Sequence, residues 1–371
     1  MLITRALLTP YRVRSSFAAT LLVSGTMLIS AASAQESQTP PFKFETALTT
    51  AQSLPRMRSL LVSWNGDLVL ERYFNGAQPR GVTNIKSVSK SVMSALVGIA
   101  IEQGHLTAVE QPIVDYLGDL LPPDDNILKE QITIEDLLTM QSGLETTSNR
   151  NYGVWITSPD WVSFALRQPL ELPPGRLMEY STGNTHLLSA ILTKATGQST
   201  LEFAREVLAE PLGFYLPSWP QDPQGIYFGG NDMEMTPRQM HAFGELYLNE
   251  GRANGTQIVP RHWVENSLAR RAQSRRERNR YYGYGWWIRE MAGHETTYAW
   301  GFGGQFIVLV PELNLIVVTT SSSNPGPGRR AHTQRIYDLV EYEVIAAASE
   351  DLGFPSESRK RPIFDYSTSG Q

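Results

Sequence analysis

The segment 82–103 constrains the fold of this chain more than any other stretch. Its apolar residues recur at helical spacing with small residues between them, so a helix here can pack closely on both sides. Gly104 follows, at a position where helices commonly end. The sequence therefore predicts a buried central helix around which the rest of the chain packs.

Polar residues occupy the first turn of this predicted helix. Ser87 and Lys90 lie three residues apart and therefore share one helix face. A serine becomes a nucleophile when a base lies within hydrogen-bond reach, and burial at the positive helix N-terminus favours the neutral, basic form of a lysine. In the alternative interpretation Ser87 only caps the helix and Lys90 is solvated. A Ser-x-x-Lys spacing is a weak motif by itself, so other segments must decide between the two.

Residues 1–34 have the pattern of a secretory signal peptide. Three arginines precede the apolar run 17–29, and a small-residue cleavage site ends at Ala34. The competing interpretation is a retained membrane anchor, for which the apolar run is short. The chain has no cysteine, which excludes a lipoprotein anchor and a disulfide framework. We expect a bacterial periplasmic or secreted protein with no stable membrane insertion after signal removal.

The charge of the chain limits its partners. A formal net charge of −5 gives no reason to expect a nucleic-acid partner, so the expected partner is a small-molecule substrate. Six arginines nevertheless cluster within residues 270–280. This cluster is predicted to be a solvated loop or helix face, with contact to an anionic substrate or to the cell envelope as the alternative.

Strand patterns occur at both ends of the chain, and helix patterns lie between them. An Asn-Gly turn at 65–66 joins two apolar runs into a hairpin, and aromatic and β-branched runs return late in the sequence. The strands are predicted at 58–64, 68–74, 284–289, 297–300, 305–310 and 315–321. The helices are predicted at 82–103, 132–140, 160–167, 185–196, 237–249, 260–269 and 331–348.

This order of elements predicts an α+β fold. Residues 56–104 and 281–349 are expected to form an antiparallel sheet built from both chain ends and flanked by helices, and residues 105–280 a mostly helical inserted domain. Residues 35–55 are predicted to be a loose lead-in and residues 350–371 a tail. No internal repeat and no Pro- or Gly-rich linker separates independent domains.

Two later segments hold further candidate site residues. Tyr180 ends a turn-rich loop just before a helix, and a phenol near an ammonium group can lose part of its proton and act as acid and base. The alternative is a packed tyrosine with its hydroxyl on the surface. The second segment is the glycine-rich run of Trp300, Gly301, Phe302, Gly303, Gly304 and Gln305. Its glycines allow backbone N–H groups to approach a ligand and bind an oxyanion, with a β-bulge or tight turn as the alternative.

Together these segments resemble the serine β-lactamase and penicillin-binding-protein superfamily. They are most similar to its class C-like branch, which includes family VIII esterases and 6-aminohexanoate-oligomer hydrolases. The similar motifs are the Ser-x-x-Lys run Ser87 to Lys90, the segment 132–144, the pair Tyr180-Ser181, and the glycine-rich turn before residues 305–312. The resemblance covers about residues 55–345.

The resemblance implies a β-lactamase-like fold and a mechanism. Ser87, deprotonated by Lys90 together with Tyr180, would attack a carbonyl, and water would then release the acyl group. The implied mechanism requires no metal and no organic cofactor, and the six histidines show no metal-ligand spacing.

Two departures from the resembled pattern bear on the substrate. Thr182 stands where the tyrosine motif often has asparagine, and Trp300 stands near the usual lysine or histidine of the third motif. A cation there would pair with a substrate carboxylate, whereas a tryptophan favours neutral acyl or alkyl groups. We therefore expect hydrolysis of a small ester or linear amide. The alternatives are a β-lactamase or D-amino-acid peptidase, and a penicillin-recognising sensor without turnover. Tyr152 and Trp155 are expected to roof the pocket, with surface packing as the alternative.

Overall fold

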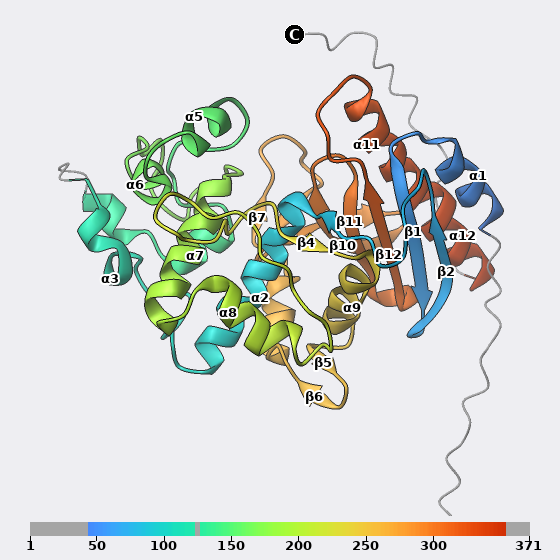
Figure 1. The fold of residues 1–371 in the computed structure, drawn as a ribbon, viewed down its shortest axis with the longest axis horizontal. Coiled ribbons are helices and arrows are strands. Elements are labelled where there is room, and N and C mark those ends of the chain that lie inside the picture. The colour runs from blue at the N-terminus through green and yellow to red at the C-terminus, as the bar shows by residue number, and fades with distance from the viewer. Residues whose placement is uncertain (1–43, 123–126, 354–371) are drawn as a thin grey trace, which may run out of the picture. The chain divides into compact units, whose positions relative to one another are not determined.

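The computed structural model describes residues 44–122 and 127–353, and an antiparallel sheet runs through them. Its eight strands are β1 (Met57–Trp64), β2 (Asp67–Tyr73), β7 (Ala272–Gln273), β8 (Tyr281–Tyr282), β9 (Trp287–Met291), β10 (His294–Gly301), β11 (Gln305–Val310) and β12 (Leu315–Ser321). Their order in the sheet is β2-β1-β12-β11-β10-β9-β8-β7. Because β1 pairs with β12, strands from both ends of the chain meet inside one sheet (Figure 1).

Two tight turns set the register at one end of the sheet. Asn65 and Gly66 adopt positive φ angles of 52° and 85°, which confirms the predicted Asn-Gly hairpin between β1 and β2. Asn314, at φ 48°, turns the chain from β11 into β12. The N–H of Asn65 donates to the carbonyl of Asn314 at 3.0 Å, so the two turns support each other.

Helices cover both faces of the sheet. One face is covered by α1 (Glu45–Ser53), α11 (Arg329–Asp338), the π-helical turns of η7 (Leu339–Ile345) and α12 (Ala346–Asp351); the other is covered by α2 (Ser89–Glu102) and α9 (Pro237–Leu248) (Figure 1). Side chains alternate along β1. Leu60 and Val62 belong to the apolar cluster on the side of α1, α11 and η7, whereas Leu61 belongs to the cluster on the side of α2 and α9. The sheet is therefore buried on both sides.

The chain between β2 and β7 is mostly helical. Its helices, besides α2 and α9, are η1 (Lys86–Val88), α3 (Val114–Leu117), η2 (Gly118–Leu120), η3 (Ile127–Gln131), α4 (Ile134–Leu138), η4 (Asn149–Asn151), α5 (Tyr152–Ile156), α6 (Trp161–Leu166), α7 (Thr182–Thr196), α8 (Thr200–Ala204), η5 (Arg205–Ala209) and α10 (Arg261–Ser267). Its short strands are β3 (Thr83–Asn84), β4 (Glu234–Met235), β5 (Arg252–Ala253) and β6 (Thr256–Gln257). The predicted starts of three helices are confirmed, because Thr133, Asp160 and Thr236 each accept a backbone N–H at an N-cap.

The central helix is confirmed as buried, but it begins later than predicted. Every side chain of α2 from Ser89 to Ala100 is buried. Lys86 adopts a left-handed φ of 52°, which a right-handed α-helix does not accommodate, so Lys86 and Ser87 form the 3₁₀ turn η1 and α2 begins only at Ser89. Gly98 allows the closest packing, since a Cβ there would lie 2.3 Å from the ring of Trp263.

Other elements differ from the sequence predictions at their ends. The segment predicted as a loose lead-in contains helix α1, which packs against η7 and β1. The strand predicted at 284–289 lies instead at 287–291, as β9. The two-residue strands β7 and β8, which were not predicted, form the edge of the sheet next to it. The last helix continues to Asp351, beyond its predicted end. The predicted signal peptide lies outside the described residues, as does most of the predicted tail.

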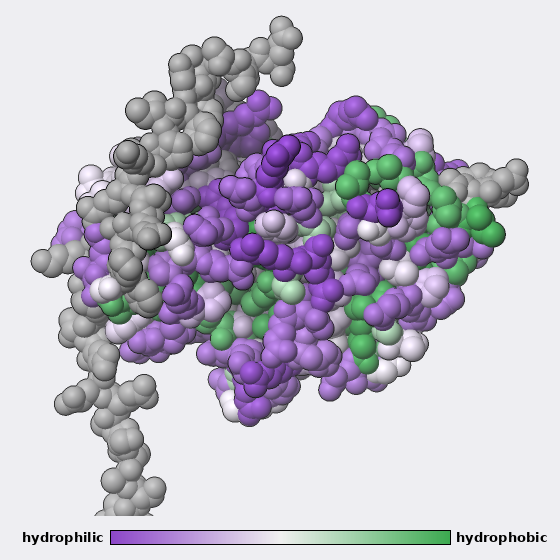
Figure 2. Space-filling model, turned by 180° about the vertical axis from the view of Figure 1, so that it is seen from behind, coloured by the Kyte–Doolittle hydropathy of each residue, from purple (hydrophilic) through white to green (hydrophobic). Residues whose placement is uncertain are grey.

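The described residues belong to one compact unit. Among them, no helix combines the length and the apolar character needed to cross a bilayer. The face in Figure 2 is mostly hydrophilic, with hydrophobic residues in several separate patches. Large exposed apolar side chains come from scattered segments: Leu68, Val82, Ile127, Val154, Leu177 and Tyr215.

Candidate active site

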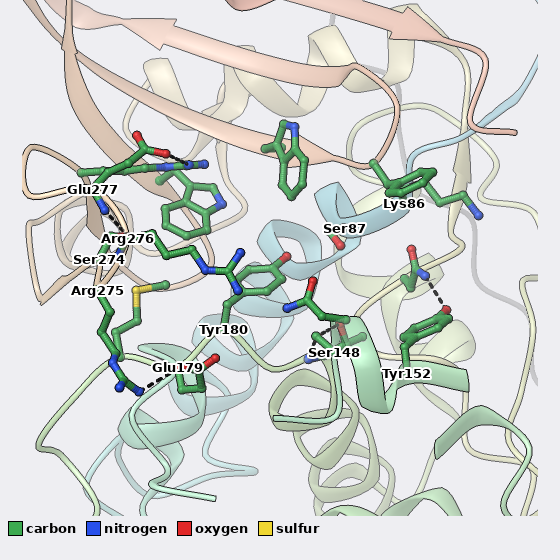
Figure 3. Close-up of a pocket in the computed structure, with 18 of the residues that line it drawn as sticks. Lys86, Ser87, Ser148, Tyr152, Glu179, Tyr180, Ser274, Arg275, Arg276 and Glu277 are labelled. Carbon is green, nitrogen blue, oxygen red and sulfur yellow. Dashed lines mark hydrogen bonds and ion pairs between the residues drawn. The ribbon is translucent and has the colours of Figure 1, made fainter. Parts of the chain in front are cut away.

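A cavity of about 650 Å³ brings together residues from distant parts of the chain. Among the sequence-predicted residues, Ser87, Tyr152, Tyr180, Trp300 and Phe302 line this cavity (Figure 3). They come from η1, from α5, from the loop before α7, and from the end of β10 and the turn after it. The cavity is therefore the place where the candidate motifs meet.

Ser87 is held in position by the strained residue before it. Lys86 has a positive φ, a conformation that costs energy for a residue with a side chain. The side chain of Asn84 accepts the N–H of Lys86 at 2.9 Å, and the Lys86 ammonium pairs with Asp232 at 2.7 Å. These contacts fix the turn that presents the Ser87 hydroxyl to the cavity.

Lys90 lies directly behind this hydroxyl. Its Nζ is 3.1 Å from the Ser87 Oγ and also donates to the carbonyl of Gly230 at 2.5 Å. The side chain is 1% exposed, and burial lowers the Lys90 pKa to about 7, although the charge of Asp232 opposes the shift. A large fraction of Lys90 is therefore a neutral amine near pH 7, able to accept a proton from Ser87.

Tyr180 remains a neutral phenol, which corrects the expected partial deprotonation. Burial raises its pKa well above the usual range, and the hydrogen bond with Ser87 opposes this only in part. The Lys90 Nζ lies over the Tyr180 ring, 5.0 Å from its centre, and Trp287 stacks on the same ring. The lysine thus faces the ring rather than drawing a proton from the hydroxyl.

Thr182, which stands where the tyrosine motif often has asparagine, lies next to Lys90. Its Oγ1 lies 3.3 Å from the Lys90 Nζ and 2.9 Å from the Ser148 hydroxyl. Asn184, two residues on, is buried and accepts from Ser142 instead. Asn184 therefore does not take the place of the asparagine that the tyrosine motif often has.

A loop that the sequence analysis missed completes the surroundings of Lys90. Gly230 supplies the carbonyl for the amine, the Asn231 amide donates to the Tyr152 hydroxyl at 2.8 Å, and Asp232 pairs with Lys86. A Cβ on Gly230 would lie 2.3 Å from the Thr185 hydroxyl, so this position requires glycine. The run Gly-Gly-Asn-Asp before a capped helix is a visible turn pattern, but its partners are far away in sequence.

The glycine-rich turn lies against the nucleophile segment. A Cβ on Gly301 would lie 2.3 Å from the carbonyl of Ile85, and Gly303 and Gly304 have φ angles of 94° and 111° that favour glycine. Gln305 lies outside the cavity lining, where its side-chain amide joins both backbone groups of Ser321. Gly301, Gly303, Gly304 and Gln305 therefore shape the turn, while Trp300 and Phe302 reach the cavity.

The two predicted roof residues have different places. Tyr152 lines the cavity. Its pKa is raised to about 12, mainly by burial and to a lesser extent by the negative charge of Asp232. Trp155 is fully buried in an aromatic cluster, with its indole N–H donating to the carbonyl of Trp161 at 3.0 Å. The prediction of a roof was therefore wrong for Trp155, because its ring fills the core beneath α5.

Arg275, Arg276 and Arg278 are exposed in a loop, as predicted, but part of the arginine cluster also lines the cavity. Arg275, Arg276 and Arg280 line it. Arg280 is largely buried, with its guanidinium 3.9 Å from the Trp287 ring centre.

Among the described residues, no group of three or more His, Asp or Glu side chains is placed to hold a metal ion. The site thus offers a hydroxyl, a neutralisable amine and a phenol beside cationic and aromatic walls, a set suited to acyl transfer.

Comparisons with known proteins place the chain in a family. The chain is 26% identical over 296 residues to the 6-aminohexanoate-dimer hydrolase of Paenarthrobacter ureafaciens, covering 73% of this chain and 74% of that protein. The fold is similar to EstCE1, a hydrolase with promiscuous acyltransferase activity (TM-score 0.65, 17% identity, 80% of this chain and 97% of that one). It is also similar to the penicillin binding protein from Bacillus halodurans (TM-score 0.63, 17% identity, 80% and 98% coverage). The family model for Beta-lactamase matches residues 55–341, so this chain, with its β-lactamase-like α+β fold, belongs to the Beta-lactamase family.

Proposed function

We propose that the protein is a serine hydrolase that acts through an acyl-enzyme on a small ester or a linear amide. The observation that carries this proposal is the position of Lys90. Its Nζ lies 3.1 Å from the Ser87 hydroxyl in a buried environment that lowers its pKa to about 7. Burying an amine costs free energy, so a lysine with a structural role alone would be unfavourable at this place.

The proposed reaction uses the three polar groups in sequence. Neutral Lys90 takes the proton of Ser87 as the Oγ bonds to the substrate carbonyl carbon. Backbone N–H groups of Ser87 and of the turn after Gly301 stabilise the oxyanion. Tyr180 donates its proton to the leaving oxygen or nitrogen and recovers one from the Lys90 ammonium. Lys90, neutral again, takes a proton from water as the water oxygen adds to the acyl carbon; the bond to Ser87 then breaks, the Ser87 Oγ takes this proton from Lys90, and the acid product leaves.

The cavity wall and the relatives support the proposed substrate class. Trp287, Trp300 and Phe302 give one side an aromatic surface suited to alkyl chains. The similarity to a 6-aminohexanoate-dimer hydrolase supports a linear amide, and the candidate nucleophile Ser87 could attack an ester in the same way. A β-lactamase or D-amino-acid peptidase is the second candidate, favoured by the family match itself. A penicillin-recognising sensor would use the same serine without turnover.

Three substrates separate these possibilities. Purified protein and Ser87→Ala are each given a short-chain p-nitrophenyl ester, the linear 6-aminohexanoate dimer and a chromogenic cephalosporin. We expect steady turnover of the ester or the dimer and loss of at least about 1000-fold in Ser87→Ala, since the nucleophile is gone. Faster turnover of the cephalosporin would favour the β-lactamase, and a single burst without turnover would identify the sensor. Equal activity of Ser87→Ala would overturn the proposal.

We further propose that the protein acts in the periplasm or outside the cell. The support is the sequence pattern of residues 1–34 and the absence of cysteine. N-terminal sequencing of the protein exported by a Gram-negative host should begin at Gln35. An intact N-terminus in the cytoplasmic fraction would contradict this.

A further inference from the structure

The loop 274–280 places positive charge over a cavity in a chain that is negative as a whole. Four cationic side chains line the cavity, against two carboxylates, although the net charge of the chain is −5. The cations are Lys86, Arg275, Arg276 and Arg280, and the carboxylates are Glu179 and Glu277. Such a local excess attracts anionic ligands into a cleft.

Three of the four cations already have carboxylate partners. Lys86 pairs with Asp232 at 2.7 Å, Arg275 with Glu179 at 3.0 Å, and Arg280 with Glu277 at 3.1 Å. Arg280 is further fixed by Trp287, on which its guanidinium lies. These three groups therefore have their charge satisfied within the protein.

Arg276 differs from the others. Within residues 44–122 and 127–353, no carboxylate lies within ion-pair distance of its guanidinium. Figure 3 shows its side chain extended from the loop into the cavity, on the side of Tyr180. An extended cation that enters a cavity without a partner is available for a ligand, and a guanidinium can bind a carboxylate through two parallel hydrogen bonds.

The loop that carries Arg276 is anchored close to the proposed reaction centre. The Ser274 hydroxyl accepts the N–H of Arg276 at 3.2 Å, which closes a turn. Arg275 ties this turn to Glu179, the residue directly before Tyr180. The position of Arg276 is thereby coupled to the segment that presents the phenol.

From these contacts we infer that Arg276 binds a carboxylate at one end of the substrate while the reacting carbonyl lies at Ser87. The inference rests on the proposed hydrolase function and narrows its substrate class to esters or linear amides that end in a free carboxylate. Tyr180 and Trp287, which stack between the loop and Lys90, would support the alkyl chain that joins the two groups. The tryptophan at position 300 led us to expect neutral groups, but a cation from another segment of the chain enters the same cavity.

A matched pair of esters tests the inference. Mono-4-nitrophenyl adipate ends in a carboxylate, and its methyl ester has the same chain without the charge. The readout is the ratio of kcat/KM for the two esters, so a general loss of activity in a variant cancels. The variants are Arg276→Gln and, as the matched control on the same loop, Arg278→Gln, whose side chain is exposed like that of Arg276 but does not line the cavity.

We expect the wild type and Arg278→Gln to prefer the anionic ester by about tenfold, as one charge-assisted pair at a partly exposed site would give. Arg276→Gln should lower this ratio to about one, and Arg276→Glu should reverse the preference. Added salt should weaken the preference in the wild type. No preference in the wild type, or an equal loss in Arg278→Gln, would overturn the inference. Turnover of the neutral ester that Ser87→Ala retains would instead overturn the hydrolase proposal.

Discussion

Among single residues, Lys90 is the base of the proposed mechanism. Burial lowers its pKa and the negative charge of Asp232 raises it. The resulting pKa of about 7 allows the amine to act as a base at neutral pH. Asp232 acts on Lys90 while it is itself paired with Lys86. Removing the charge of either member of this pair should therefore shift the pKa of Lys90.

The pH dependence of ester hydrolysis should report this tuning. Lys90 must be neutral to accept the proton of Ser87, so kcat/KM should rise as the pH passes through about 7 and then level. Asp232→Asn removes the charge that raises the Lys90 pKa, so the midpoint should move to lower pH. Lys86→Gln leaves the Asp232 charge uncompensated, so the midpoint should move to higher pH. Lys90→Met should lower the plateau by about 100-fold to 10,000-fold.

The two pair variants serve as controls for each other. Both break the same ion pair, so loss of the pair alone would shift both profiles in the same direction. Unchanged midpoints in both variants would show that the titrating base is a group other than Lys90.

The sequence predicted some of these residues better than others. Ser87 and Lys90 share a helical turn, so their proximity follows from local geometry, and the contact of 3.1 Å is consistent with that prediction. Gly230 and Asp232 were missed, because they reach Lys90 through a loop about 140 residues away in sequence. The neutral state of Tyr180 also depends on burial by neighbours such as Trp287, which no local pattern reveals.

Helix α2 is the element on which the site depends. Its burial on all sides requires small residues, and Gly98 approaches Trp263 of α10 most closely. This feature was predictable from the spacing of small residues, but the partner helix was not. The predicted start of the helix was wrong. The positive φ of Lys86 depends on its contacts with Asn84 and Asp232, which form only in the folded state.

A single methyl group on α2 should therefore destabilise the protein. In Gly98→Ala the new Cβ would overlap the Trp263 ring, and forcing the two apart should lower the free energy of unfolding by about 1–3 kcal/mol. Gly153→Ala is the matched control, since Gly153 is an exposed helical residue whose added Cβ meets nothing within 4 Å. This control should change stability by no more than about 1 kcal/mol, in the stabilising direction. Urea denaturation of both variants measures the difference; equal stability would show that α2 and α10 pack less tightly than the structure has them.

At the scale of the whole molecule, the sheet and the helical part share one core. The same apolar cluster contains Leu61 of β1, Val92 of α2, Leu188 of α7 and Ile316 of β12. The sequence predicted strands from both chain ends, and the sheet confirms this arrangement. It did not predict the edge strands β7 and β8, because two-residue strands are too short to show an alternating pattern.

A shared core should make unfolding cooperative. We expect one calorimetric transition, with loss of ester hydrolysis at the same temperature, because neither part keeps its own apolar surface buried alone. Two resolved transitions, with activity lost at the first, would show that the helical part unfolds independently.

The most direct test of the central claim is to map the site of covalent modification. The protein is treated with a fluorophosphonate, digested, and analysed by tandem mass spectrometry beside Ser87→Ala and Lys90→Met. The account predicts one phosphonyl group on Ser87, no label in Ser87→Ala, and labelling slowed by about 100-fold or more in Lys90→Met at pH 7. A label on Ser89 or on a serine outside the cavity, formed equally fast in Ser87→Ala, would contradict it.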